Sequence, residues 1–157
     1  MPQEPDLTAA AASTDGLLIV CPHCSTKNRV GRDRLRDGPT CGNCKASLFP
    51  GKPIDLTTAT FDRHVAGDAA LVVDFWAAWC GPCRMMAPAF AEAASSVGPG
   101  VQLAKVDTEA EPAIASRFGI RSIPTLIAFR NGREIARQSG ALSLPQLMQW
   151  IATHAKN

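Results

Sequence analysis

The 157-residue chain has no strong excess of charge of either sign and no long apolar run at its start. Its 16 basic and 14 acidic residues give a formal net charge of +2, which excludes a large electrostatic field for holding nucleic acid or an anionic membrane. The longest early apolar run, Leu17 to Val20, is too short to cross a bilayer. We therefore expect neither a membrane partner nor a nucleic-acid partner.

The first residues also lack the basic region with which a secretory signal begins. Residues 1–15 contain Glu4, Asp6 and Asp15 but no lysine or arginine. Residues 1–16 are mostly small or polar and show no pattern that could bury apolar surface, so we expect a disordered leader. Together these features predict a cytoplasmic protein.

No cysteine is left without a close neighbour in the sequence. A structural disulfide framework usually joins distant segments, whereas closely spaced pairs favour metal binding or a catalytic dithiol in a reducing compartment. The six cysteines form three C-x-x-C pairs, which are Cys21/Cys24, Cys41/Cys44 and Cys80/Cys83.

The first two pairs have the spacing of a zinc ribbon, because sixteen residues separate them. A two-residue spacer lets both sulfurs of a pair face one ion while backbone amides in the turn hydrogen-bond to them. Residues 17–50 contain few large apolar side chains, so metal binding would have to replace the missing core. We predict one structural Zn²⁺ per chain, with the ligands Cys21, Cys24, Cys41 and Cys44.

Other interpretations of this segment stay open. Cys21-Pro22-His23-Cys24 follows a strand-like run and imitates a redox dithiol, although residues 25–37 lack the 3.6-residue apolar period of a following helix. His23 is expected to be an exposed spacer, because four cysteines complete the metal shell. The segment between the pairs carries five basic and two acidic residues. It could bind a partner, but no aromatic residue is present to stack on bases, and a solvated hairpin is the simpler interpretation.

Proline and glycine in residues 49–53 mark a boundary, after which residues 54–157 are expected to form a second domain. Its pattern predicts an α/β fold in the order β-α-β-α-β-β-α, with a mixed sheet covered by helices on both sides. The expected helices run from a cap at Thr57 or Thr58 to Val65, from the third cysteine pair to Ser96, from Glu111 to Phe118, and onward from a cap at Ser143. The expected strands are 71–76, 101–106, 126–129 and 134–138, the last two joined by an Asn131-Gly132 turn.

The third pair, Cys80 and Cys83, follows an apolar strand and opens a helix that Pro88 should kink. A cysteine at a helix N-terminus lies near free N–H groups and the positive end of the helix dipole, which lowers its pKa. Cys80 is therefore the expected attacking thiolate, and Cys83, one turn later, is the expected resolving thiol. A second metal site is disfavoured, since no further cysteine pair remains.

Asp74 is the one charged residue in this strand. Burial of a carboxylate is costly and raises its pKa, so the residue should have a role. A buried carboxylate satisfied by backbone groups is the alternative.

Trp79-Cys80-Gly81-Pro82-Cys83 resembles the active site of the thioredoxin family. The resemblance extends from residue 54 to residue 154 and includes the family's counterparts of Asp74, Pro88, Lys105, Ile123-Pro124-Thr125, Gly132 and Gly140. With the four-cysteine module in front, the whole chain resembles the second type of bacterial thioredoxin, which carries an N-terminal zinc ribbon.

The resemblance implies a thioredoxin fold and a monomeric protein-disulfide reductase. Cys80 and Cys83 would act through a mixed disulfide, Asp74 would take the proton of Cys83 through a water, and Lys105 would be the charge partner of Asp74. The implied substrate-binding residues are Trp79, Gly81, Pro82, Ile123, Pro124 and Gly140, with a cis bond before Pro124. The implied partners are disulfide-containing target proteins and a thioredoxin reductase that draws on NADPH, with no organic cofactor bound to this chain.

Two further hypotheses concern the ribbon. The chain could be a zinc-ribbon binding module with the second domain as a scaffold, but such a use would not need Asp74, Cys80 and Cys83 together. Alternatively, oxidation of the four ribbon cysteines could release zinc and modulate the enzyme.

Overall fold

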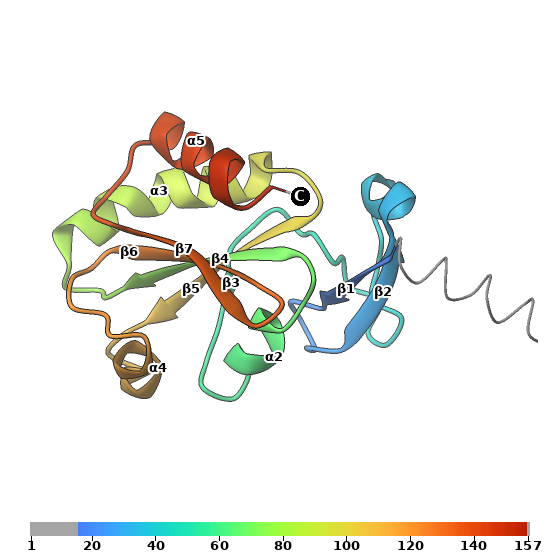
Figure 1. Ribbon diagram of the computed structural model, residues 1–157, viewed down its shortest axis with the longest axis horizontal. Coiled ribbons are helices and arrows are strands. Elements are labelled where there is room, and N and C mark those ends of the chain that lie inside the picture. The colour runs from blue at the N-terminus through green and yellow to red at the C-terminus, as the bar shows by residue number, and fades with distance from the viewer. Residues whose placement is uncertain (1–15, 157) are drawn as a thin grey trace, which may run out of the picture.

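A computed structural model describes residues 16–156 and places them in a two-stranded ribbon module and a five-stranded sheet covered by helices (Figure 1). The predicted leader, residues 1–16, lies outside the described residues except for Gly16, with which the first strand begins. Within residues 16–156, no helix combines the length and the apolar character that crossing a membrane requires.

The ribbon module is built from β1 (Gly16–Val20) and β2 (Lys27–Gly31), which pair antiparallel, followed by the 3₁₀ helix η1 (Arg32–Asp37). Leu17 and Ile19 alternate into a small core with Leu48 and buried cysteines. The sequence did not predict β2, because only Val30 of its five residues is buried and the pattern is otherwise polar. The backbone hydrogen bonds with β1 keep this polar segment extended as a strand.

The main sheet has the strand order β3-β5-β4-β6-β7. Strands β3, β5 and β4 are parallel, whereas β6 and β7 are antiparallel to their neighbours, which confirms the expected mixed sheet. The central strand is buried from Ala70 to Phe75. The five strands are β3 (Ile54–Asp55), β4 (Ala70–Trp76), β5 (Val101–Asp107), β6 (Thr125–Arg130) and β7 (Arg133–Ser139).

Two helices cover each face of this sheet (Figure 1). On one face lie α3 (Gly81–Ser96) and α5 (Leu144–His154), and on the other lie α2 (Phe61–Val65) and α4 (Pro112–Arg117). Alternate side chains of β4 serve the two cores, since Val72 packs with α3 and α5 while Val73 packs with α2. Helices on both faces explain why β4 is apolar without interruption until Asp74.

Some predicted boundaries were wrong by a few residues. Helix α2 begins at Phe61, not after Thr57 or Thr58, because the Thr57 carbonyl accepts the amides of Thr60 and Phe61 in a turn before the helix. Helix α4 is one residue shorter at each end than expected. The cap at Ser143 is confirmed, and α3 runs as one helix to Ser96 with Pro88 inside it.

The ribbon packs near the N-terminal ends of β4 and β5, at the other end of the sheet from the start of α3 (Figure 1). The buried side chain of Gln102 donates to the carbonyls of Val20 and Leu48, at 3.3 and 3.0 Å. The amide of Leu18 donates to Oδ2 of Asp68, and the amide of Asp68 donates to the carbonyl of Leu18. The ribbon is therefore fixed to the larger domain through polar contacts, of which those of Gln102 are buried.

Candidate active site and candidate metal centre

The pair Cys80 and Cys83 sits at the N-terminus of α3, where Cys80 is the N-cap residue and forms a disulfide with Cys83. Pro82 favours the helix start, because its fixed φ suits the first turn and its missing N–H leaves no unpaired donor there. The amide of Cys83 donates to Sγ of Cys80 at 3.2 Å. When the disulfide is reduced, this amide and the positive helix end stabilise a thiolate at Cys80.

Only one residue of the pair lines an open groove. Cys80 lines a groove of about 460 Å³ together with Trp79, Pro82 and Ile123, whereas Cys83 is not part of its lining. The Trp79 side chain at its edge is 66% exposed, a large apolar surface beside the sulfur. Thr108, Ile120 and Arg121 also line the groove, although they were not among the site residues predicted from the sequence. Ile120 and Arg121 are close in sequence to the predicted residue Ile123, whereas nothing in the sequence marks Thr108.

The loop before β6 lies against the dithiol. The Ile123–Pro124 bond is cis, as the resemblance implied, and the carbonyl oxygen of Ile123 is 3.7 Å from Sγ of Cys80. The amide of Gly140 donates to the carbonyl of Pro124 at 2.9 Å. Gly140 has φ of 96°, and a Cβ built there would meet no atom within 4 Å, so space is open beside this loop.

Asp74 is buried in β4, with 1% of its surface exposed, and neither carboxylate oxygen has a hydrogen-bond partner among the described residues. The alternative of a carboxylate satisfied by the backbone is therefore wrong. Burial raises the pKa of Asp74 to about 7, although the positive charge of Lys105 opposes this shift. Asp74 shares the strand face of Val72, which packs with α3, the helix that carries Cys83.

Lys105 lies opposite Asp74 in the parallel pairing of β4 and β5. Its Nζ is 4.5 Å from the centroid of the Trp76 ring, a cation–π contact. No ion pair within 4.0 Å joins Lys105 to Asp74 in the part of the chain that the structure describes. Lys105, the expected charge partner, therefore lowers the pKa of Asp74 from a distance of more than 4.0 Å, and its ammonium group lies against the Trp76 indole.

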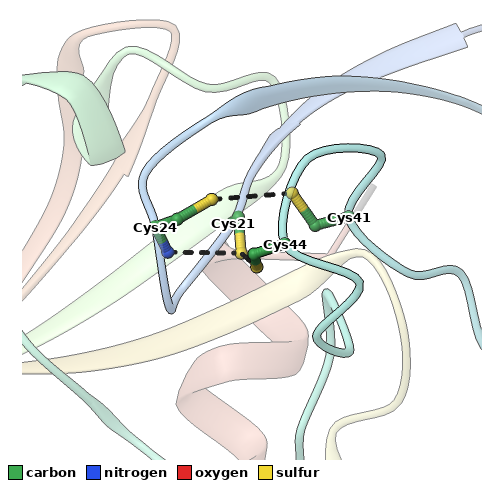
Figure 2. A group of neighbouring side chains, drawn as sticks. All are labelled: Cys21, Cys24, Cys41 and Cys44. Atoms are coloured by element: carbon green, nitrogen blue, oxygen red, sulfur yellow. Dashed lines mark hydrogen bonds between the residues drawn. The ribbon is translucent and has the colours of Figure 1, made fainter.

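The four ribbon cysteines converge on one point (Figure 2). Their sulfurs lie within 4.8 Å of one another, with 3.6 Å between those of Cys21 and Cys44 and 3.6 Å between those of Cys24 and Cys41. Tetrahedral zinc with Zn–S bonds of about 2.3 Å requires sulfurs about 3.8 Å apart. The four residues predicted as ligands therefore fit a Zn²⁺ ion.

Backbone amides point at these sulfurs, as the spacing predicted. The amides of His23 and Cys24 donate to Sγ of Cys21 at 3.3 and 3.5 Å, and the amide of Asn43 donates to Sγ of Cys41 at 3.3 Å. Such bonds favour the thiolate form that binds metal. The side chain of His23 is exposed and is not part of the cluster, which confirms its expected role as a spacer.

Each C-x-x-C knuckle of the ribbon closes through one residue in the left-handed conformation. Ser25 has φ of 63° and Lys45 has φ of 69°, and their amides donate to the carbonyls of Cys21 and Cys41, both at 2.9 Å. Because neither residue is glycine, these turns could not be predicted from residue type.

The charge of the cluster also favours a cation. A hydrogen bond with the Ala46 backbone lowers the pKa of Cys44, but desolvation and the neighbouring thiols raise it to about 12. Four sulfurs this close cannot all ionise together unless a positive ion compensates their charge. A set of four thiolates at tetrahedral spacing suits zinc.

Sequence comparison places both regions in known families. Residues 52–153 match the family described as "Thioredoxin", and residues 20–46 match a zinc-ribbon family described as "Thioredoxin 2, N-terminal". Thioredoxin C-3 of Corynebacterium nephridii is 45% identical over 136 residues, which cover 86% of this chain and 93% of that protein. Thioredoxin of Alicyclobacillus acidocaldarius subsp. acidocaldarius is 46% identical over 97 residues, covering 62% and 92%.

Solved structures show the same architecture. A mutant thioredoxin from Halobacterium salinarum NRC-1 superposes with a TM-score of 0.62 at 28% identity, covering 69% of this chain and 95% of that one. The thioredoxin of Malassezia sympodialis, Mala s 13, gives a TM-score of 0.60 at 36% identity, covering 65% and 90%. The thioredoxin fold and the N-terminal zinc-ribbon region predicted from the sequence are confirmed.

Proposed function

The chain belongs to the thioredoxin family of thiol-disulfide oxidoreductases, and from this premise we propose that it reduces disulfide bonds in other proteins through Cys80 and Cys83. The observation that carries the proposal is the arrangement of the two sulfurs. Both side chains are buried, but Cys80, at a helix N-terminus, lines an open groove, whereas its disulfide partner Cys83 is not part of the groove lining. This difference supports attack by Cys80 and resolution by Cys83.

In the proposed reaction, the Cys80 thiolate of the reduced enzyme attacks one sulfur of a target disulfide. The target S–S bond breaks, a mixed disulfide with Cys80 forms, and the other target sulfur leaves as a thiolate that takes a proton from solvent. Cys83 then loses its proton and attacks Sγ of Cys80, and the second target sulfur leaves. The target gains two electrons and two protons, and the enzyme is left with the Cys80–Cys83 disulfide.

Asp74 is the proposed acceptor for the proton of Cys83, through a water as the resemblance implies. Its pKa of about 7 suits an exchange of protons near neutral pH. Its carboxylate has no hydrogen-bond partner among residues 16–156, so no described group competes for the proton. The proposed role of Lys105 is to keep the pKa of Asp74 from rising further.

The target segment is proposed to bind in an extended form beside Ile123. Pro124 has no N–H, the carbonyl of Ile123 lies beside Sγ of Cys80, and the space next to Gly140 is open. Backbone pairing with Ile123 would place a target disulfide at the sulfur irrespective of its side chains. Trp79, Gly81 and Pro82 would form the opposite wall.

We further propose that a thioredoxin reductase returns two electrons from NADPH to the Cys80–Cys83 disulfide. The enzyme would then act as a cytoplasmic monomer without an organic cofactor of its own. The closely paired cysteines, which suit a reducing compartment, support this proposal.

The proposed role of the ribbon is structural, with one Zn²⁺ per chain held by Cys21, Cys24, Cys41 and Cys44. The metal would supply the folding energy that a small core cannot. Elemental analysis and thiol titration of one reduced sample should give one zinc and two reactive thiols per chain. A sample with no zinc and six reactive thiols would contradict this assignment.

The proposed reaction is tested by coupling the chain to a thioredoxin reductase and NADPH with a model disulfide protein as substrate. We expect NADPH consumption that depends on the chain. A Cys83→Ser variant should accumulate a mixed disulfide of Cys80 with the target, visible as one covalent adduct by mass spectrometry. If the adduct forms on any ribbon cysteine instead, the proposal is wrong.

A further inference from the structure

We propose that Arg121 determines substrate specificity by favouring target disulfides that have an acidic residue within two positions of the attacked cysteine. This inference rests on the proposed disulfide reductase function and names a class of substrate for it.

The chemistry of the groove singles out Arg121. Among the described residues that line it, Arg121 is the only one with a charged side chain. The other large side chains in the lining, those of Trp79, Pro82, Ile120 and Ile123, are apolar and accept many sequences. Arg121 is therefore the charged group that a bound target meets directly in this groove.

The Arg121 guanidinium is available to an incoming group. Its side chain is exposed, and no hydrogen bond or ion pair involves it within residues 16–156. Two other arginines of the domain are already engaged, since Arg117 pairs with Asp62 at 2.8 Å and Arg137 pairs with Glu134 at 2.8 Å. A planar guanidinium without a partner is suited to bind a carboxylate through two parallel hydrogen bonds.

Among the described residues, no acidic side chain near this end of the sheet forms an ion pair with Arg121. Asp107 accepts the backbone amides of Glu109 and Ala110 with Oδ1, at 2.9 and 3.3 Å. Glu111 accepts two hydrogen bonds from Thr58, both at 2.8 Å. Glu109 is exposed but does not line the groove.

The position of Arg121 sets which target residues it reaches. It precedes Ile123 by two residues, and the Ile123 carbonyl lies 3.7 Å from Sγ of Cys80. Two residues of extended chain span about 7 Å, so a side chain one or two positions from the target cysteine falls within reach of Arg121. Arg84 adds a second positive charge at this end, where its Nη1 donates to the Ala78 carbonyl at 2.9 Å.

The test uses disulfide-linked peptide dimers that carry glutamate, glutamine or lysine at one position, scanned over the two residues on each side of the cysteine. Prereduced full-length protein is mixed with each dimer under single-turnover conditions, so that no reductase is needed. At low ionic strength, the second-order rate constant for at least one position should be about threefold higher with glutamate than with glutamine, and about threefold lower with lysine. In 1 M NaCl these ratios should approach one.

Arg121→Gln should remove the difference between the glutamate and lysine peptides. The matched control is Arg133→Gln, which removes an exposed arginine at the far end of β6 and β7 and should keep the difference. Equal rates for all peptides with the unaltered protein, or an undiminished preference in Arg121→Gln, would overturn the inference. If no peptide is reduced, the proposed function itself fails, which is a distinct outcome.

Discussion

The pairs Cys21/Cys24 and Cys80/Cys83 share one local structure but have different surroundings. In each, the amide of the second cysteine donates to the sulfur of the first, at 3.5 Å in the ribbon and 3.2 Å in the larger domain. The C-x-x-C spacing therefore produces the same N–H···S turn in both places. The spacing alone does not decide between a metal ligand and a redox dithiol.

The difference begins at the next residue. After Cys24 the chain adopts the left-handed conformation at Ser25 and folds back, so both sulfurs of the pair face the second knuckle. Cys83 instead lies in the first turn of α3, which continues to Ser96, so Cys80 stays at the helix N-terminus and no second knuckle within residues 16–156 meets the pair. The residues that follow a C-x-x-C turn thus decide what its sulfurs can meet.

Among the changes that test this difference between the two cysteine pairs, zinc removal should have the largest effect on stability. Structural zinc in small modules contributes about 10 kcal/mol or more of apparent binding free energy. We therefore expect strong chelation, or Cys41→Ser, to abolish amide exchange protection in residues 17–50 while β4 and β5 remain protected. Hydrogen exchange with mass spectrometry measures both regions in one sample. Retained protection of the ribbon without metal would show that its small core is sufficient.

Cys80→Ser should abolish the redox activity and leave the zinc site intact. Loss of the attacking thiolate is expected to lower disulfide reduction by at least about a thousandfold, because no other thiol lines the groove. The zinc content should stay at one per chain. The coupled NADPH assay and elemental analysis test both expectations, with Cys24→Ser as the matched variant that should lose zinc. Substantial activity in Cys80→Ser would remove the distinction between the two pairs.

Asp74 should make the larger domain sensitive to pH. Its pKa is raised from 3.8 to about 7, so the unfolded chain binds fewer protons than the native one between these values. The free energy of unfolding should therefore fall as pH rises from about 4 to 7, by up to about 4 kcal/mol, and change little above pH 7 through this group. Denaturant titrations of the oxidised protein across this range give the dependence.

Asp74→Asn should remove that dependence, stabilise the protein at pH 8 and slow resolution of the mixed disulfide by about tenfold. Asp55→Asn, which alters an exposed carboxylate at the edge of the sheet, is the control and should preserve the dependence. An unchanged pH dependence in Asp74→Asn would mean that another group titrates.

The turn that distinguishes the ribbon pairs should give the smallest effect. Lys45→Val puts a β-branched residue at φ of 69° and should destabilise the ribbon by about 1–2 kcal/mol. Lys45→Gly is the matched control and should cost less, because glycine adopts this conformation without strain. Competition for zinc with a coloured chelator reports the difference. Equal zinc affinity in both variants would show that the left-handed residue is not a constraint.

The sequence predicted those parts of the fold in which a regular pattern dominates. The apolar run of β4 and the 3.6-residue period of α3 and α5 gave elements close to the observed ones. Strands β2 and β3 were missed because one is polar and the other has two residues, so pairing with β1 and β5 defines them. Both cysteine sites followed from spacing and from the motifs around them.

Contacts between segments far apart in the sequence could not be predicted from local sequence patterns. The hydrogen bond from Gln102 to Val20 joins residues 82 positions apart, and nothing in the sequence marks either one. Arg121 likewise appears in the groove only because the loop before β6 folds against the start of α3. The location of the ribbon and the charge of the groove therefore required the structure.

The ribbon contacts the molecule near the start of β4 and β5, whereas the dithiol follows the other end of β4, a strand of seven residues. A strand of that length separates its two ends by about 20 Å. A bead, a fluorophore or a second protein attached to the ribbon would consequently leave the groove open. The molecule can be held at its metal-binding end while a large folded client approaches the other.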